Sequence, residues 1–243
     1  MAKIPKNPEE VFEEFSEDMK GVFGGDLVSI ILYGSGASGH YVPGKSDLNF
    51  LIVLTQEGID NLDRAANAAA RWRTRKVSTP IFMTQAEILS SLDCYPIEFL
   101  SMKRHYTVVS GPDILSTLTF KPSYLRLQAE RELKAKILHL RRGFLDAEGN
   151  ARRIRELIKP SFTAFISIFR ALLYLKGADI PHSQRDIVHA MAREYSIAPA
   201  VFLACADVKE GVDRISASEI RNILVDYMKE IEKLSAAVDS MNV

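Results

Sequence analysis

The hydrophobic pattern of the first 120 residues predicts short strands that alternate with helices. Four apolar runs are rich in β-branched or aromatic residues and are bounded by turn-forming residues, as buried strands usually are. These runs are residues 28–33, 50–54, 77–84 and 105–110. Strands that alternate with helices in this way predict a small sheet covered by helices.

Helices are expected before, between and after these strands. Asn7 has the side chain of a helix cap, and the helix that follows it should end at Gly24. Asn61, together with the acid before it, is expected to cap a basic helix over residues 62–76 that crosses over to the third strand. A short helix is expected over residues 85–92.

From residue 122 onward the pattern is helical throughout. Ser216 and Glu219 form a capping-box pattern, and Pro160 is expected to bend its helix because it lacks an amide donor. The predicted helices cover residues 123–147, 151–176, 183–195 and 199–210 and a stretch that begins at 216. The sequence therefore predicts an α+β protein, with a mixed sheet and helices in residues 1–120 and an all-α helical bundle in residues 121–243.

Composition and charge exclude several classes of protein. Of 243 residues, 31 are Lys or Arg and 31 are Asp or Glu, so the formal net charge is zero and does not favour nucleic acid or an anionic membrane. Cys94 and Cys205 are too few for a disulfide scaffold or a zinc site. The N-terminus lacks the apolar centre of a signal peptide, and no apolar run approaches the length of a membrane span. We expect a cytoplasmic protein without a membrane partner.

A glycine-bearing turn follows the first predicted strand. Gly34, Ser35 and Gly36 stand directly after residues 28–33. A glycine lets the backbone approach a phosphate closely, and the serine hydroxyl and nearby amides offer donors to phosphate oxygens. The residue types at this turn favour a site for a phosphorylated ligand.

Polar residues open the second predicted strand. Ser46 and Asp47 precede Leu48, and Asn49 follows it. Residues two apart in a strand point to the same face, so Asp47 and Asn49 are expected to project side by side. A carboxylate and an amide oxygen can both ligate magnesium, but the amide of Asn49 brings no negative charge.

The strand, the Gly-Ser turn, the spacer and the Ser-Asp-x-Asn segment resemble the signature of the nucleotidyltransferase superfamily, which has a polymerase-beta-like fold. In that superfamily the second position is Asp, and a third carboxylate comes from a following strand. The resemblance implies that Gly34, Ser35, Gly36 and Ser46 bind a nucleoside triphosphate, as substrate or ligand. It also implies that Asp47 and Asn49 are catalytic and hold Mg²⁺. These roles are implied by the resemblance alone.

The sequence departs from this signature in its acids. Residues 77–84 contain no Asp or Glu, and comparison with the resembling aminoglycoside nucleotidyltransferases places the missing acid at Pro80 or within one or two residues of it. Glu98 is the nearest acid that could replace it, although pairing with Lys103 or Arg104 is its more ordinary role. Of three expected carboxylates only Asp47 is found, so magnesium binding is expected to be weak or absent.

The helical second half also resembles known architectures. In the aminoglycoside nucleotidyltransferases such a bundle forms the far wall of the acceptor cleft, and HEPN domains accompany minimal nucleotidyltransferases in toxin and antitoxin pairs. The HEPN ribonuclease motif needs an Arg and a His separated by four to six residues, whereas Arg185 and His189 are separated by three. The basic residues of 62–76 and 123–147 are interpreted as solvated helix faces rather than as a nucleic-acid surface.

Two functions of different classes follow. One is magnesium-dependent transfer of a nucleotidyl group to a hydroxyl of a small molecule or protein. The other is a catalytically inactive pseudoenzyme that senses a nucleotide or binds a partner, as an antitoxin does. The sequence leaves open the nucleotide, the acceptor and the oligomeric state, a homo-oligomer included.

Overall fold

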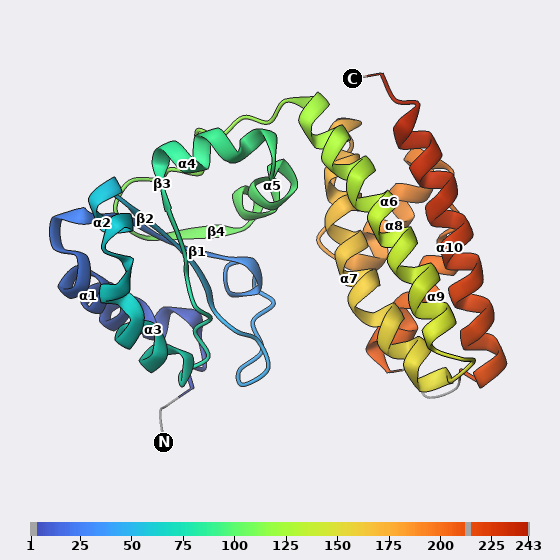
Figure 1. The fold of residues 1–243 in the computed structure, drawn as a ribbon, viewed down its shortest axis with the longest axis horizontal. Helices are drawn as coiled ribbons and strands as arrows, with labels where there is room; N and C mark the ends of the chain where they lie inside the picture. The colour runs from blue at the N-terminus through green and yellow to red at the C-terminus, as the bar shows by residue number, and fades with distance from the viewer. Residues whose placement is uncertain (1–3, 212–214, 243) are drawn as a thin grey trace. The chain divides into compact units, whose positions relative to one another are not determined.

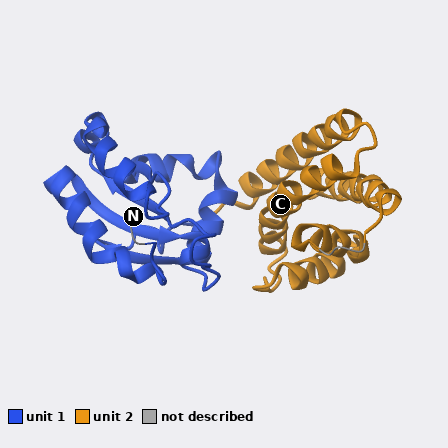
Figure 2. Cartoon of the chain, turned by 90° about the horizontal axis from the view of Figure 1, so that it is seen from below, with its two compact units in different colours: residues 1–119 blue, residues 120–243 orange. Residues whose placement is uncertain are grey.

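The computed structural model describes residues 4–211 and 215–242. The chain divides into two compact units, Met1–Thr119 and Phe120–Val243 (Figure 2). The first unit contains a four-stranded sheet with helices, and the second contains helices in its described part (Figure 1). This arrangement confirms the predicted α+β fold class.

The sheet of the first unit is mixed. Its strands are β1 (Leu27–Tyr33), β2 (Asn49–Leu54), β3 (Ile81–Thr84) and β4 (Tyr106–Ser110), in the order β3-β2-β1-β4. β1 pairs antiparallel with both β2 and β4, whereas β2 pairs parallel with β3. A parallel pair needs a crossover connection, and α2 (Gln56–Asp60) and α3 (Ala66–Arg73) provide it.

One face of the sheet packs against α1 (Phe12–Phe23) and α3. Phe15 of α1 stacks on Phe50 of β2 at a centroid distance of 4.4 Å and meets Trp72 of α3 edge-on at 5.1 Å. The Trp72 indole nitrogen donates a hydrogen bond of 2.7 Å to Asp18. Leu48 belongs to the same buried cluster, so alternate residues of the β2 segment point into this core.

The other face of the sheet is also apolar along most of its length. Ile31, Leu51 and Val53 are buried there. Helices α4 (Gln85–Ser90) and α5 (Pro96–Arg104) lie across the sheet from α1 and α3 (Figure 1). At the end of the sheet where β2 starts, this face carries the polar residues that the sequence singled out.

The crossover differs from the single helix predicted over residues 62–76. It consists of α2, a 3-10 turn (η4, Leu62–Ala65) and α3, which ends at Arg73. Thr55 caps α2 by accepting a hydrogen bond from the Gly58 amide. Asn61, the predicted cap, instead donates its side-chain amide to Glu57 O at 2.8 Å, so the cap prediction was wrong.

The second unit is a helical bundle, as predicted. Its helices are α6 (Pro122–Asp146), α7 (Ala151–Leu175), α8 (Gln184–Tyr195), α9 (Pro199–Glu210) and α10 (Ala217–Asp239). α7 contacts all four of the others and contributes much of the core. Pro160 lies inside α7, which continues to Leu175.

α7 corrects one expectation from the sequence. Among the described residues it is a helix long and apolar enough to cross a membrane, although no run of that length was expected. Half of its most apolar 18-residue window is buried within the structure. The core helix of a bundle has the same length and composition, and the contacts of α7 with its four neighbours account for its apolar face.

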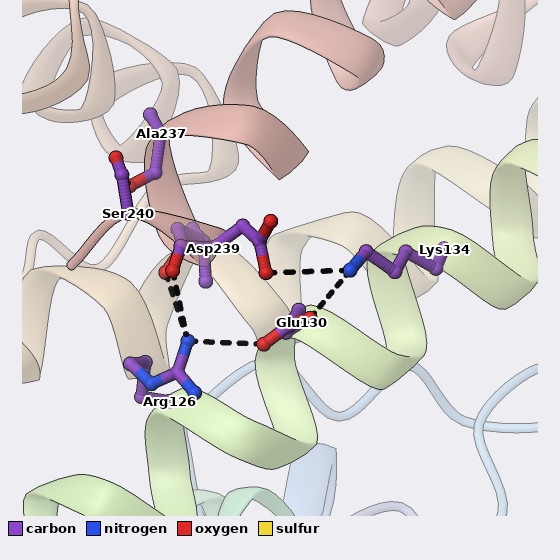
Figure 3. A network of polar contacts seen from close by, with 7 residues as sticks. Arg126, Glu130, Lys134, Ala237, Asp239 and Ser240 are labelled. Carbon is purple, nitrogen blue, oxygen red and sulfur yellow. Dashed lines mark hydrogen bonds and ion pairs between the residues drawn. The ribbon is translucent and has the colours of Figure 1, made fainter.

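Charged residues tie α6 to the end of α10 (Figure 3). Arg126 donates to Glu130 at 2.9 Å and to Val238 O at 3.2 Å, and Lys134 pairs with both Glu130 and Asp239. Arg126 and Lys134 of α6 therefore meet acids within the bundle.

Candidate functional site

The turn after β1 has the backbone that its glycine predicts. Gly34–Gly36 forms a 3-10 turn (η3), and Gly34 has a φ of +75°. The amides of Ala37 and Ser38 both donate to Gly34 O at 3.1 Å, which closes the turn. A residue with a Cβ atom adopts this φ only with strain, so glycine is required at position 34.

Asn49 lies directly beside this turn. It pairs with Tyr33 in the antiparallel register of β1 and β2. Its Nδ2 atom is 3.5 Å from the position that a Cβ atom would take on Gly34. The turn and the polar start of β2, separated by a loop in the sequence, therefore form one site.

Asp47 and Asn49 lie on the same face of the sheet. Leu48, between them, is fully buried in the core and bridges Val77 on the neighbouring segment. Strand alternation then places Asp47 and Asn49 on the opposite face. The Asp47 side chain is 53% exposed and Asn49 is half-buried, so both face away from the dry interior.

Lys76 is a residue of this face that the sequence interpretation missed as part of the site. Its Nζ atom lies 3.5 Å from Asp47 Oδ1. Its backbone carbonyl accepts a 2.8 Å hydrogen bond from the Leu48 amide. The position of Lys76 directly before the predicted third strand could have indicated that it lies near the site. The sequence interpretation instead counted Lys76 among the solvated basic residues of 62–76.

The third strand carries an irregularity beside Asn49. Leu48 pairs with Val77, and Leu51 pairs with Ile81. Two residues lie between Leu48 and Leu51, whereas three lie between Val77 and Ile81, namely Ser78, Thr79 and Pro80. Pro80 is buried, and by alternation it shares the core face with Phe50. Pro80 itself is therefore not the residue beside Asn49, although the prediction, which allowed a shift of one or two residues, includes the positions that are. Ser78 and Thr79 are the residues opposite Asn49.

The remaining candidates, Ser46, Ser35 and Glu98, differ in their surroundings. The Ser46 hydroxyl accepts a 3.1 Å hydrogen bond from the Val42 amide, and the Ser46 amide donates to Val42 O at 2.8 Å, so Ser46 orders the loop that precedes β2. Among the described residues no hydrogen bond holds the Ser35 hydroxyl, which leaves it available to a ligand. Glu98 is exposed on α5.

Tyrosines flank the site and stay neutral. Burial raises the pKa of Tyr33, which stands beside Asn49 in the sheet. The pKa of Tyr41 is also raised, by burial and by the charges of Glu10 and Asp47, and its hydroxyl donates to Pro5 O at 3.0 Å. Neither phenol is therefore prepared to act as a base at neutral pH.

The donors at this face do not fit the magnesium site that the resemblance implies. They are one carboxylate, Asp47, and one neutral amide, Asn49, with the ammonium of Lys76 next to the carboxylate. Within residues 4–211 and 215–242, no three His, Cys, Asp or Glu side chains come together in a way that could hold a metal ion. Hard divalent cations in proteins are usually held by several anionic oxygens.

Comparison with known proteins identifies the fold. No protein-family model matches the sequence, and no curated protein matches it. The structure is similar to that of spectinomycin adenyltransferase AAD(9) from Enterococcus faecialis with ATP and spectinomycin, with a TM-score of 0.52 and 16% sequence identity. The match covers 91% of this chain and 98% of the other. It confirms the nucleotidyltransferase fold that the sequence predicted.

Proposed function

We propose that the first unit binds a nucleoside triphosphate through the turn Gly34–Gly36 and the polar start of β2. The observation that carries the proposal is the adjacency of Gly34 and Asn49, which places a backbone open to close approach next to an amide side chain. In this arrangement the amides of the turn and the Ser35 hydroxyl donate to phosphate oxygens. The fold supports the same function, because the similar adenyltransferase structure contains ATP.

Each residue has a distinct role in this site. Gly34 lets the backbone approach the phosphates, and Ser35 donates from its hydroxyl. Gly36 lets the turn lie close to the core instead, because a Cβ atom there would be 3.0 Å from the Leu48 side chain and 3.3 Å from that of Leu32. Asn49 donates from Nδ2, since its amide can act as donor and acceptor at once. Ser46 acts indirectly, because its hydrogen bonds to Val42 fix the loop between the turn and β2.

Transfer of a nucleotidyl group to a hydroxyl is the second candidate. It is favoured by Asp47, an exposed carboxylate on the same face as Asn49 and able to accept a proton from an attacking hydroxyl. The similar adenyltransferase was solved with ATP and spectinomycin, so a small polyhydroxylated molecule is the acceptor class that we propose. The neutral Asn49 and the acid-free third strand favour the inactive alternative, a nucleotide sensor.

Two measurements test these proposals. Calorimetric titration with ATP, GTP, CTP and UTP should show saturable binding of at least one of them, and a Ser35→Ala variant should bind it several-fold more weakly. Absence of binding by all four contradicts the nucleotide site. Incubation of labelled nucleotide with spectinomycin and a panel of aminoglycosides then tests transfer. Labelling of an acceptor by the native chain, and its loss in the Asp47→Asn variant, would establish the enzyme. Nucleotide binding without labelling of any acceptor would favour the sensor.

A further inference from the structure

Lys76 and Asp47 are neighbours because of the register of the sheet. Leu48 and Val77 form a parallel bridge, and both are buried on the core face. The residues directly before them, Asp47 and Lys76, therefore stand next to each other on the opposite face. The distance of 3.5 Å between Lys76 Nζ and Asp47 Oδ1 agrees with this register.

The backbone of Lys76 is fixed in this place. Its φ is +64°, in the left-handed region that non-glycine residues adopt only with strain. Its carbonyl accepts from the Leu48 amide at 2.8 Å, and its amide donates to Arg73 O at 3.2 Å. Lys76 is thus tied to the residue between Asp47 and Asn49.

Two of the neighbouring arginines, Arg71 and Arg75, are engaged on the core side of the sheet. Arg71 forms an ion pair with Asp18, and Arg75 forms one with Glu14, both on α1. Arg75 also lies over the Trp72 ring at 4.6 Å. These contacts hold α3 and its end against the core face, whereas Lys76 is directed to the face of Asp47 and Asn49.

The formal charges of Asp47, Asn49 and Lys76 on this face add up to zero. Asp47 contributes one negative charge, Lys76 one positive charge and Asn49 none, whereas three carboxylates would contribute three negative charges. A face of zero net charge attracts a divalent cation weakly and does not repel a triphosphate. A lysine ammonium is a compact point charge that binds phosphate oxygens well.

We infer that Lys76 supplies, as a fixed ammonium, the positive charge that a divalent cation supplies to the triphosphate in magnesium-dependent nucleotidyltransferases. The nucleotide then binds without magnesium, with Lys76 against its phosphates and Asp47 holding the ammonium in place. The inference rests on the proposed nucleotide site.

The test compares nucleotide binding with and without magnesium in the full-length chain. Calorimetric titration with ATP in EDTA and with ATP in excess Mg²⁺ should give dissociation constants within about threefold of each other. Lys76→Asn should weaken binding in EDTA tenfold or more. Asparagine tolerates the left-handed backbone, so this variant should retain its melting temperature. Arg64→Met removes an exposed charge from η4 and is the matched control, with binding unchanged.

A second readout does not depend on nucleotide. Electron paramagnetic resonance with Mn²⁺ alone should show little binding by the native chain and more by Lys76→Asn, since removal of the ammonium frees the Asp47 carboxylate. ATP binding that requires Mg²⁺ and is equally tight in Lys76→Asn overturns the inference but leaves the nucleotide site standing. Absence of binding by ATP, GTP, CTP and UTP in both conditions overturns the nucleotide site, and the inference with it.

Discussion

Asn49 Nδ2 lies 3.5 Å from the point where a Cβ atom on Gly34 would stand. The two residues close opposite ends of a loop, and the antiparallel pairing of Tyr33 with Asn49 fixes their approach. The turn Gly34–Gly36 and the polar start of β2 therefore depend on each other. A change at either residue is expected to alter nucleotide binding without disturbing the core behind them.

The first prediction concerns Gly34→Ala. The substitution puts a Cβ atom on a residue with a φ of +75°, which should lower the free energy of unfolding by about 1 kcal/mol. It also fills the space between the turn and Asn49, so ATP affinity should fall at least tenfold. Urea unfolding and calorimetric titration measure the two effects.

Gly149→Ala is the matched control for this variant. Gly149 also has a φ of +75°, but it lies outside the site, between α6 and α7, and a Cβ atom there would meet nothing within 4 Å. The strain is the same and the site is untouched, so stability should fall by a similar amount while ATP affinity stays within about twofold. Equal losses of affinity in both variants would contradict the assignment of Gly34 to the phosphate site.

The elements around the site could be predicted because their signals are local. The apolar runs gave β1 and β2, and the capping box of Ser216 with Glu219 gave the start of α10. The crossover after β2 was predicted less well. Thr55 caps α2 there, but the sequence gave equal reason to place a cap at Asn61, and only packing against the sheet decides between them.

The geometry of the site could be predicted only in part. Alternation along one strand placed Asp47 and Asn49 together, which needs no knowledge of the partner strand. The position of Lys76 beside Asp47 and the position of Pro80 on the core face both depend on how β2 pairs with the segment after α3. The extra residue between Val77 and Ile81 changes which side chains face Asn49, and no local pattern in the sequence announces such a bulge.

The second prediction restores the missing acids. Two double variants add two carboxylates each near Asp47. One combines Asn49→Asp with Ser78→Asp, and the other combines Asn49→Asp with Thr79→Asp. Mn²⁺ affinity, measured by electron paramagnetic resonance, should rise at least tenfold in one of these two variants over the native chain, since hard cations prefer several anionic oxygens. Asn49→Asp with Pro80→Asp is the control. Its second carboxylate is on the core face, so Mn²⁺ affinity should not exceed that of Asn49→Asp alone, and stability should fall.

The third prediction concerns Gly111→Ala at the end of β4. A Cβ atom there would lie 2.1 Å from Val28 O, and the φ of Gly111 is +82°. Because backbone cannot move away easily, the first unit should lose about 3 kcal/mol or more of unfolding free energy. Trp72 is the only tryptophan of the chain and is buried in this unit, so its fluorescence reports the loss. Gly25→Ala, with nothing within 4 Å of its Cβ, should leave that transition near its native midpoint.

The fourth prediction concerns the network that joins α6 to α10 (Figure 3). Arg126→Met removes the bonds to Glu130 and to Val238 O, which leaves the last carbonyls of α10 without this donor. The second unit should lose about 1–2 kcal/mol. Circular dichroism at 222 nm follows this unit, while Trp72 fluorescence should not change. Arg142→Met is the control, because Arg142 is 84% exposed and its pair with Asp146 spans 3.6 Å.

The last prediction is a pH dependence that comes from Glu230 of α10. This carboxylate is 5% exposed, accepts a 2.9 Å hydrogen bond from the Ala198 amide and pairs with Lys233. Burial alone would raise its pKa, but the hydrogen bonds from Lys233 and Ala198 outweigh burial and hold the pKa below its ordinary value of 4.5. The folded state therefore binds the proton less readily than the unfolded state does.

The sign of the effect follows from this difference. Glu230 contributes stability in full above about pH 4.5, and the contribution is lost as the pH falls through the lower pKa of the folded state. Glu230→Gln keeps an acceptor for Ala198 but has no charge to lose. It should be less stable than the native chain at pH 7 by about 1 kcal/mol, and the difference should shrink between pH 5 and pH 3. Urea unfolding followed by circular dichroism at each pH measures this difference in stability.

Glu232→Gln is the control. It removes an exposed partner of Arg141 and should show a smaller loss at pH 7. A difference between Glu230→Gln and the native chain that grows toward low pH would contradict the assignment, since it would require the folded state to bind the proton more tightly.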